Sequence, residues 1–157
     1  MITMFTDGAA RGNPGRGGYG TVLIYKQHRK EFSAGYRLTT NNRMELMAVI
    51  VGLEALKKPG MKVKIFSDSQ YVVDAINKGW VFNWQKKNFK DKKNADLWRR
   101  FLEIYPKHDV EISWIKGHSG IPENERCDEL AVACADGNKL LVDEGYENGA
   151  GSQQTSL

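Results

Sequence analysis

The sequence predicts an α/β protein built on a mixed five-stranded sheet, a three-strand antiparallel meander plus two parallel strands, flanked by helices. Three segments with β-type patterning come first, joined by short polar or glycine-rich connections, which indicates the antiparallel meander. Two further strand-like segments follow, each after a segment with helical periodicity. Because a helical crossover returns the chain in the same direction, these two strands are expected to run parallel to the first.

The predicted strands combine apolar, β-branched and aromatic residues and are bounded by polar or glycine-containing segments. They span residues 1–7, 18–26, 30–38, 62–68 and 110–116. Residues 8–18, which contain several glycines and Pro14, are predicted to form a turn between the first two strands.

The predicted helices place apolar residues three and four positions apart. They span residues 42–58, 69–78, 95–105 and 123–136. The first has its apolar stripe at Leu46, Val49 and Leu53, and Pro59 is expected to end it. Residues 79–94 are expected to be helical only in part.

The composition is typical of a globular domain. With 157 residues, of which 41% are apolar and 27% charged, the chain is long enough for one domain with a sizeable core. No apolar stretch reaches the ~20 residues of a membrane helix, and the N-terminus lacks a signal-peptide pattern, so we expect a cytoplasmic protein without membrane contact. Cys127 and Cys134 would lie ~10 Å apart on one helix, too far for a disulfide, so both are expected to be reduced.

Two predicted strands end in nearly the same three residues, Phe5-Thr6-Asp7 and Phe66-Ser67-Asp68. If these strands are parallel neighbours, both carboxylates meet at the edge of the sheet where α/β proteins place their sites. Two adjacent carboxylates repel each other, and a divalent cation is the simplest way to keep both ionised. The pair therefore indicates a metal site.

Glu45 and Asp128 lie on helix faces that should pack against this sheet. An acid on such a face is costly unless it is paired or bound to a metal. Each has another explanation, because Glu45 could complete a capping box opened by Asn42, and Asp128 could pair with Arg126 or lie at the rim of a groove. Four acids from two strand ends and two sheet-covering helices nevertheless favour one shared metal site.

His118 lies in a glycine-flanked loop ten residues before Asp128. A histidine in a surface loop is most often inert, but the flanking Gly117 and Gly120 allow this one to move. Its ordinary pKa near 6.5 suits proton transfer at neutral pH.

Uncharged hydrogen-bonding residues gather near the acids in the sequence, at Asn13, Thr40, Asn41, Asn42 and Gln70. Such residues commonly form turns and caps, and Asn42 is the candidate cap of the first helix. They could also read minor-groove base edges and 2′-hydroxyl groups of a nucleic acid.

A basic and aromatic segment follows the second predicted helix. It contains Lys86, Lys87, Lys90, Lys92 and Lys93 together with Phe89, and Trp80, Trp84 and Trp98 surround it. A lysine run is usually a solvated surface, but lysines interleaved with aromatic residues favour nucleic acid, through phosphate neutralisation and stacking.

Five motifs, in this order, closely resemble bacterial type 1 ribonuclease H over residues 2–146. They are Thr6-Asp7-Gly8 with Gly12-Asn13-Pro14-Gly15; Thr39-Thr40-Asn41-Asn42-Arg43-Met44-Glu45-Leu46; Asp68-Ser69-Gln70-Tyr71; Lys116-Gly117-His118; and Glu123-Asn124-Glu125-Arg126-Cys127-Asp128-Glu129-Leu130-Ala131.

This resemblance implies a monomeric hydrolase with the ribonuclease H fold, which cleaves the RNA strand of RNA/DNA hybrids and leaves 5′-phosphate and 3′-hydroxyl ends. It implies two Mg²⁺ ions, with Mn²⁺ able to replace them, held by Asp7, Glu45, Asp68 and Asp128. His118 would be a mobile proton shuttle that helps the product leave. The catalytic domain would span residues 1–146, and the small polar residues that follow predict a disordered tail at 147–157.

The resemblance also implies the residues that contact the substrate. Asn13, Asn41, Asn42 and Gln70 would line the minor groove, Thr40 and Asn94 would hold a DNA phosphate, and Trp80, Trp84 and Trp98 with Lys86, Lys87 and Lys90 would form the DNA-side channel and basic protrusion.

The chain departs from the family pattern in the region expected to meet the DNA strand. Phe89 replaces a common tryptophan, the basic segment is several residues short, and Leu38 stands where an arginine often assists the phosphate pocket, with Arg37 one position earlier. Two other classes of protein share some of these features. The chain is too short for a polymerase-linked nuclease and its loop and basic segment argue against an integrase, while a hybrid-binding module without catalysis would not need the complete acid set.

Overall fold

The structure, a computed structural model, describes residues 1–149. Its strands are β1 (Ile2–Arg11), β2 (Gly15–Tyr25), β3 (His28–Thr39), β4 (Lys62–Ser67), β5 (Asp109–Trp114) and β6 (Leu140–Leu141). Its helices are α1 (Asn41–Glu54), α2 (Gln70–Asn77), α3 (Trp80–Lys86), α4 (Ala95–Ile104), α5 (Pro122–Ala135) and α6 (Glu144–Glu147), with a 3₁₀ turn at Tyr105–Lys107.

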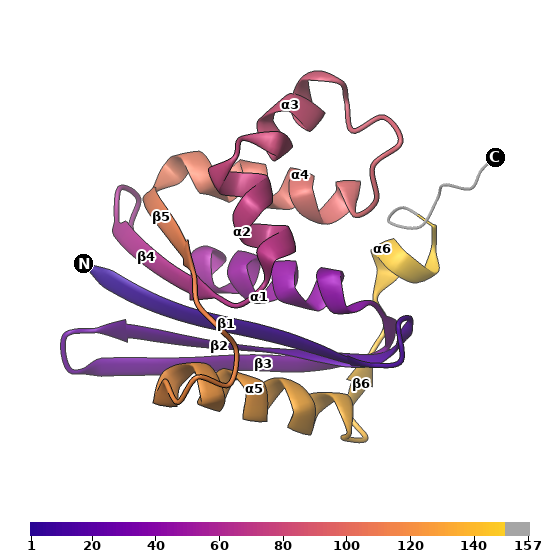
Figure 1. The fold of residues 1–157 in the computed structure, drawn as a ribbon, viewed down its shortest axis with the longest axis horizontal. Helices are drawn as coiled ribbons and strands as arrows, with labels where there is room; N and C mark the ends of the chain where they lie inside the picture. Colours follow the sequence, from indigo (N-terminus) through magenta and orange to yellow (C-terminus); the bar gives the residue numbers. More distant parts are fainter. Residues whose placement is uncertain (150–157) are drawn as a thin grey trace.

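One mixed sheet, in the order β5-β4-β1-β2-β3-β6, forms the centre of the molecule. Helices α1 to α4 lie on one side of the sheet and α5 on the other (Figure 1). Strands β1, β2 and β3 form the antiparallel meander, and β4 and β5 are parallel to β1. The predicted fold class is therefore confirmed. Within residues 1–149, no helix has the length and apolar character needed to cross a membrane.

The first hairpin is longer than the sequence pattern indicated. Residues 8–18 were expected to be a turn, but β1 continues to Arg11 and β2 begins at Gly15, so the connection is short. The continued pairing of Asp7 with Gly20 and of Ala10 with Gly17 explains this, because glycines of β2 complete the ladder although they carry no strand signal.

Strand β6 and helix α6 were not predicted. The two residues of β6 pair in parallel with Gly35 and Tyr36 of β3 and so extend the sheet to six strands. Helix α6 includes Glu147, the first residue of the expected tail, and residues 150–157 of that tail lie outside the described residues.

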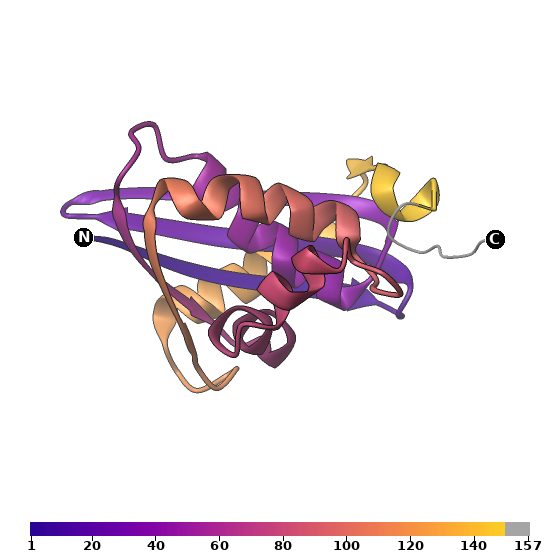
Figure 2. The same cartoon turned by 90° about the horizontal axis from the view of Figure 1, so that it is seen from above.

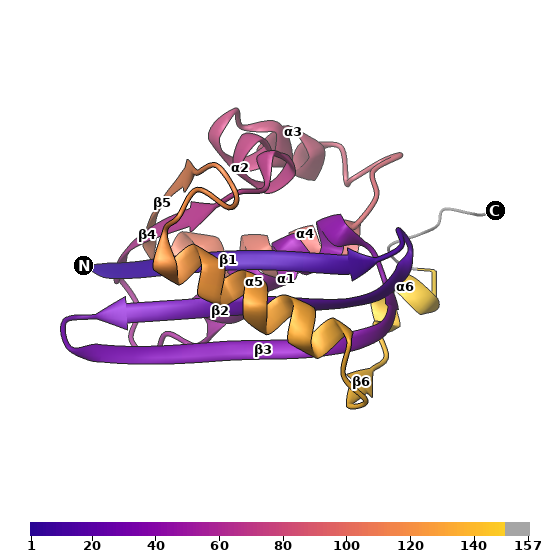
Figure 3. The same ribbon diagram turned by 60° about the horizontal axis from the view of Figure 1, so that its bottom comes forward.

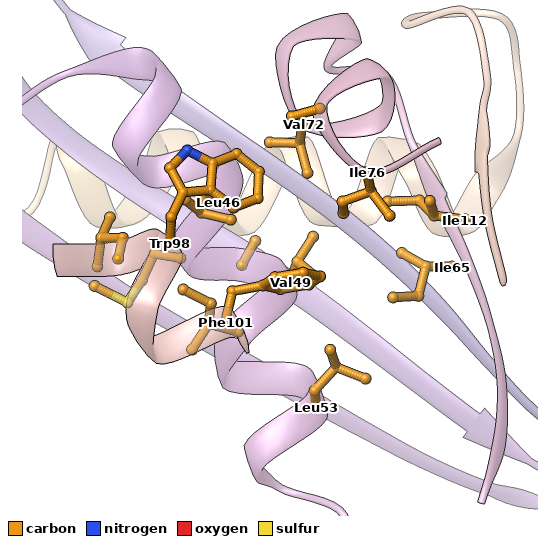
Figure 4. Close-up of a cluster of buried hydrophobic side chains, with 14 of the residues drawn as sticks. Leu46, Val49, Leu53, Ile65, Val72, Ile76, Trp98, Phe101 and Ile112 are labelled. Atoms are coloured by element: carbon orange, nitrogen blue, oxygen red, sulfur yellow. The ribbon is translucent and has the colours of Figure 1, made fainter. Parts of the chain in front are cut away.

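Helix α1 is buried on nearly all sides because it lies between the sheet and α4. Figure 2 shows α4 lying lengthwise above the sheet. The side chains of this layer form the main core, in which Leu46, Val49, Leu53, Ile65, Val72, Ile76, Trp98, Phe101 and Ile112 are almost fully buried (Figure 4). Each large apolar side chain buried in this way stabilises the fold by about 1.5–3 kcal/mol.

Helix α5 crosses the opposite face of the meander (Figure 3). Its buried residues include Cys127 and Ala131, while Leu130 and Cys134 of the predicted stripe are only half-buried. The Cys127 thiol donates to the Phe5 carbonyl at 3.2 Å, which fixes α5 over β1. Both cysteines are free, as predicted.

Candidate metal centre and nucleic-acid interface

Asp7 and Asp68 meet because β1 and β4 are parallel neighbours in matched register. Phe5 pairs with Phe66 and Thr6 with Ser67, so the two aspartates come next on both strands. The two phenylalanine rings stack with centroids 5.2 Å apart beneath them. Strand β4 ends at Ser67 while β1 continues, so Asp7 is not at a strand end as expected but at the point where its parallel neighbour stops.

Helix α1 brings Glu45 to the same place. Gly8 permits this close approach, because a Cβ at residue 8 would overlap the backbone nitrogen of Glu45. As a result, carboxylate oxygens of Asp7, Glu45 and Asp68 all lie within 4.8 Å of one another. The structure thus brings together three of the four acids that the sequence predicted.

Asp128 reaches this cluster from α5. Its carboxyl lies outside the group of three, but its negative charge contributes to the raised pKa of Asp7. Arg126, the alternative partner considered for Asp128, instead pairs with Glu31 at 3.0 Å and with Glu129 at 3.1 Å. Asp128 therefore lies next to Asp7, at the border of the group of three.

The cluster is electrostatically unfavourable for a protein without a bound cation. Burial, followed by the charges of Asp68 and Asp128, raises the pKa of Asp7 to about 8, although the Gly8 amide donates to its carboxylate at 2.8 Å. Burial, followed by the charges of Asp7 and Asp68, raises the pKa of Glu45 well above its usual range. Burial also raises the pKa of Asp68.

The donor set fits a hard divalent cation. Glu45 Oε1 and Asp68 Oδ1 are buried and have no hydrogen-bond partner, so both carry unshared lone pairs. Mg²⁺ binds carboxylate oxygens and keeps several waters, and its positive charge would reverse the mutual repulsion of these groups.

His118 lies beside the cluster in the exposed loop after β5. Its backbone is in the left-handed region with φ of 55°. A Cβ on the preceding residue, Gly117, would lie 2.6 Å from Asp68 Oδ2, so this loop packs directly against the Asp68 carboxylate. The charge of His118 lowers the pKa of Asp68, against the larger opposite effect of burial.

A cleft of about 340 Å³ lies near the start of α1. Its lining residues are Asn13, Pro14, Thr40, Asn42, Lys93, Asn94 and Tyr146. Four of them were predicted as substrate contacts, so the structure brings these residues to one surface. Thr40, not Asn42, is the N-cap of α1, because its hydroxyl accepts from the Arg43 amide at 3.2 Å; the helix begins one residue earlier than expected, and Asn42 and Glu45 do not form a capping box.

Hydrogen bonds hold two of the other predicted amide side chains, Asn13 and Asn94. Asn13 Oδ1 accepts from the Asn41 backbone amide at 3.0 Å, which joins the β1–β2 turn to the start of α1. Asn94 is buried, and its amide donates to the Tyr71 hydroxyl at 3.0 Å. Gln70 is exposed at the start of α2, two residues after Asp68.

The basic segment has exposed lysines, but only some of its aromatic side chains reach the surface. Lys86, Lys87 and Lys90 are exposed, Trp80 is 43% exposed and Trp84 is half-buried. Trp98, predicted to line the DNA channel, is fully buried and its indole donates to Tyr71 at 2.9 Å, so it is a core residue. Phe89 is also buried, with the Arg99 guanidinium 4.8 Å from its ring centroid.

Arg37, one position before Leu38, forms a surface ion pair with α6. Its guanidinium pairs with both carboxylate oxygens of Glu147 on α6, at 2.9 and 2.8 Å, while Leu38 is exposed on the surface.

A buried ion-pair network below the cleft was missed from the sequence. Arg43 donates to Asp143 at 2.8 Å and to Asp96 at 2.7 Å, and Asp143 also accepts from the Thr39 hydroxyl at 2.6 Å. An arginine on a helix that should pack against the sheet was the available signal, but its partners lie far along the chain and no local pattern identifies them.

The fold and the site together define an α/β protein with a carboxylate cluster where β4 ends beside β1. The family profile named RNase H matches residues 1–136. The chain is 57% identical to Ribonuclease H of Desulforamulus reducens over 147 residues, covering 90% of this chain and 92% of the relative, and 54% identical to that of Trichodesmium erythraeum, covering 93% and 96%.

Solved structures of ribonucleases H are also similar to this chain. LC9-RNase H1, described as a type 1 RNase H with the type 2 active-site motif, is similar with a TM-score of 0.78 at 32% identity, covering 98% of this chain and 82% of that one. LC11-RNase H1, solved in complex with RNA/DNA hybrid, is similar with a TM-score of 0.63 at 29% identity, covering 87% and 97%. The chain belongs to the ribonuclease H family, and the resemblance to its bacterial type 1 members is confirmed.

Proposed function

We propose that this enzyme hydrolyses the RNA strand of RNA/DNA hybrids and leaves 5′-phosphate and 3′-hydroxyl ends. The observation that carries the proposal is the buried cluster of Asp7, Glu45 and Asp68, with Asp128 beside it. Family membership and the hybrid bound to the related LC11 enzyme support the choice of substrate.

Asp7, Glu45, Asp68 and Asp128 would hold two Mg²⁺ ions, which Mn²⁺ could replace. When bound, such ions supply Lewis-acid stabilisation for the attacking water and for the leaving 3′-oxygen. The carboxylates would hold the ions where β4 ends beside β1, and the scissile phosphate would bind there through those ions. In such a site the bound metal ions would neutralise the charge of the phosphodiester.

His118 would accept and return a proton at an imidazole nitrogen as the product leaves. Its exposed loop and its proximity to Asp68 support this role, since the side chain can approach the reacting phosphate without belonging to the rigid acid cluster.

The surface beside the acids would hold the duplex. Asn13, Asn41, Asn42 and Gln70 would contact the minor groove, and Thr40 and Asn94 would hold a phosphate of the DNA strand. Trp80, Trp84, Lys86, Lys87 and Lys90 would follow the DNA backbone, without Trp98. We further propose that residues 1–146 are the catalytic domain and that the enzyme is monomeric and cytoplasmic.

End-labelled duplexes of one sequence test the proposal. With Mg²⁺, the RNA of an RNA/DNA hybrid should be cleaved at least 100-fold faster than RNA/RNA or DNA/DNA, and the products should carry 5′-phosphates. Binding of the hybrid without cleavage at any Mg²⁺ or Mn²⁺ concentration would instead favour a binding module, and equal cleavage of all three duplexes would contradict hybrid specificity.

A further inference from the structure

The C-terminal helix α6 contributes to the cleft that borders the start of α1. Tyr146 of α6 lines this cleft together with Thr40, Asn42 and Asn94, although it lies about a hundred residues away from the first two in the chain. The half-buried Tyr146 ring is the one large aromatic surface among the lining residues.

The chemistry of the cleft matches a nucleic-acid backbone. Its lining combines three asparagine amides, one threonine hydroxyl and the exposed Lys93 ammonium, with no carboxylate. Such a surface suits a phosphate diester, since amides, hydroxyls and lysine are the groups that commonly contact backbone phosphates. A tyrosine adds a ring face for the apolar side of a sugar and a hydroxyl that donates a hydrogen bond.

The buried network fixes Tyr146 relative to the other lining residues. Asp143 accepts from the Tyr146 backbone amide at 3.3 Å and from Arg43 at 2.8 Å. Arg43 in turn binds Asp96 at 2.7 Å, two residues after Asn94. The network therefore connects Tyr146 with α1 and with the start of α4, which both contribute residues to the cleft.

We propose that Tyr146 is a substrate-binding residue that contacts the sugar-phosphate backbone of the DNA strand in this cleft, and that Asp143 is the positioning residue that holds it there. The inference rests on the proposed function and deepens it, because it adds the C-terminal segment to the surface that recognises the hybrid. Tyr146 then contributes to affinity, while the acid cluster performs the chemistry.

Kinetics with modified hybrids test the inference. A series of hybrids carries a single uncharged methylphosphonate at successive positions of the DNA strand, and kcat and KM are measured for each. Tyr146→Ala should raise KM for the unmodified hybrid by about 5- to 10-fold, with kcat within twofold of the unmutated enzyme, as expected for loss of one aromatic contact. One methylphosphonate position should raise the KM of the unmutated enzyme most. At that position the modification should raise the KM of Tyr146→Ala by a smaller factor, because the substitution and the modification remove the same contact.

Two further variants separate binding from folding. Tyr146→Phe keeps the ring and should raise KM about 2- to 3-fold with the same reduced sensitivity at that linkage; it remains the test if Tyr146→Ala does not fold. Asn148→Ala is the matched control, because it removes a 2.8 Å side-chain bond to Glu144 on the same helix but lies outside the cleft, and its kinetics should be unchanged.

Unchanged KM and unchanged linkage sensitivity in both Tyr146 variants would overturn the inference while leaving hybrid cleavage intact. Failure of the unmutated protein to cleave any hybrid would overturn the proposed function, and this inference with it. An equal effect of Asn148→Ala would show that α6 acts only through folding, which also contradicts a contact at Tyr146.

Discussion

The proposed chemistry depends on a few carboxylates whose ionised forms are disfavoured by burial and by one another's charge. Asp7 and Glu45 are buried beside each other and beside Asp68, and burial raises the pKa of each. The sequence predicted these acids because two strand ends repeat one pattern and because acids on packing faces need an explanation. It could not predict their exact convergence, which requires the close approach of β1 and α1 at Gly8.

Asp7→Asn or Asp68→Asn should abolish cleavage and leave the fold largely intact. Each change removes a charge that a divalent cation needs, without altering side-chain volume. Hybrid cleavage in Mg²⁺ and far-ultraviolet circular dichroism check this together. More than a few per cent of residual activity in a folded variant would show that the residue is not an essential metal ligand.

The metal-free protein should lose stability as the pH rises from about 4 to about 8. In this range the folded state keeps a proton on Asp7, whose pKa is raised to about 8, while the unfolded state has released it, so unfolding becomes more favourable with rising pH. In EDTA at pH 8, Asp7→Asn should unfold roughly 2–4 °C above the unmutated protein, equivalent to about 1 kcal/mol. At pH 4 the two melting temperatures should converge, and a constant difference at every pH would contradict the assigned cause.

His118→Ala should slow cleavage without abolishing it. A proton shuttle contributes roughly 10²–10⁴-fold at most, and the loss should lie mainly in kcat. Single-turnover and steady-state rates of the variant, measured beside those of His28→Ala as a surface control, distinguish a proton shuttle from an inert surface histidine. An unchanged rate would return His118 to the inert-loop interpretation.

The secondary structure shows where sequence patterns are sufficient and where they are not. Helices α2 and α4 agree with their predicted spans almost to the residue, because periodicity and end signals coincide there. The extension of β1 past Asp7 and the two-residue β6 were missed, because their pairing partners are glycine-rich or remote in the chain. Trp98 looked like part of a nucleic-acid surface beside the lysines, but α4 turns it into the core.

The basic segment should contribute affinity and not chemistry. Lys86, Lys87 and Lys90 are exposed, and each phosphate contact adds about 0.9 to the slope of log affinity against log salt. The triple alanine variant should therefore show a higher KM, a flatter salt dependence and nearly unchanged kcat. If the short segment reaches fewer than three phosphates, the slope should change by less than the amount expected for three contacts. Replacing Lys57 and Lys58 on the α1–β4 connection together with Lys62, the first residue of β4, gives a charge-matched control. Equal salt slopes in both triple variants would mean that the basic segment is only a solvated surface.

At the scale of the whole molecule, one network of ion pairs connects segments that lie far apart in the chain. Arg43, Asp96 and Asp143 connect α1, α4 and the segment that follows β6, so Asp143 and the start of α6 are held beside α1 and α4. The fold class, the convergence of the acids and the gathering of Asn13, Thr40, Asn42 and Asn94 at one cleft follow from local patterns and motifs in the sequence. The network does not follow from them, because it depends on partners about fifty and a hundred residues apart.

Asp143→Asn should destabilise the protein by about 2–4 kcal/mol, because it leaves the buried Arg43 with one carboxylate in place of two. Asp136→Asn is the matched control, since it breaks the half-exposed pair with Arg11 and should cost less than about 1 kcal/mol. Chemical denaturation of both variants measures the two values. Similar small losses would show that the buried network does not hold the C-terminal segment in place.

A Mg²⁺ titration followed by both RNA cleavage and thermal unfolding tests most directly whether the buried carboxylates form the working metal site. Binding to the folded state alone should raise the melting temperature as cleavage of the hybrid appears, over the same range of Mg²⁺ concentration. Asp68→Asn should weaken both responses, and EDTA should abolish cleavage. Cleavage of the hybrid in EDTA, or an equal thermal response to Mg²⁺ in Asp68→Asn, would contradict the assignment of this cluster as the catalytic metal centre.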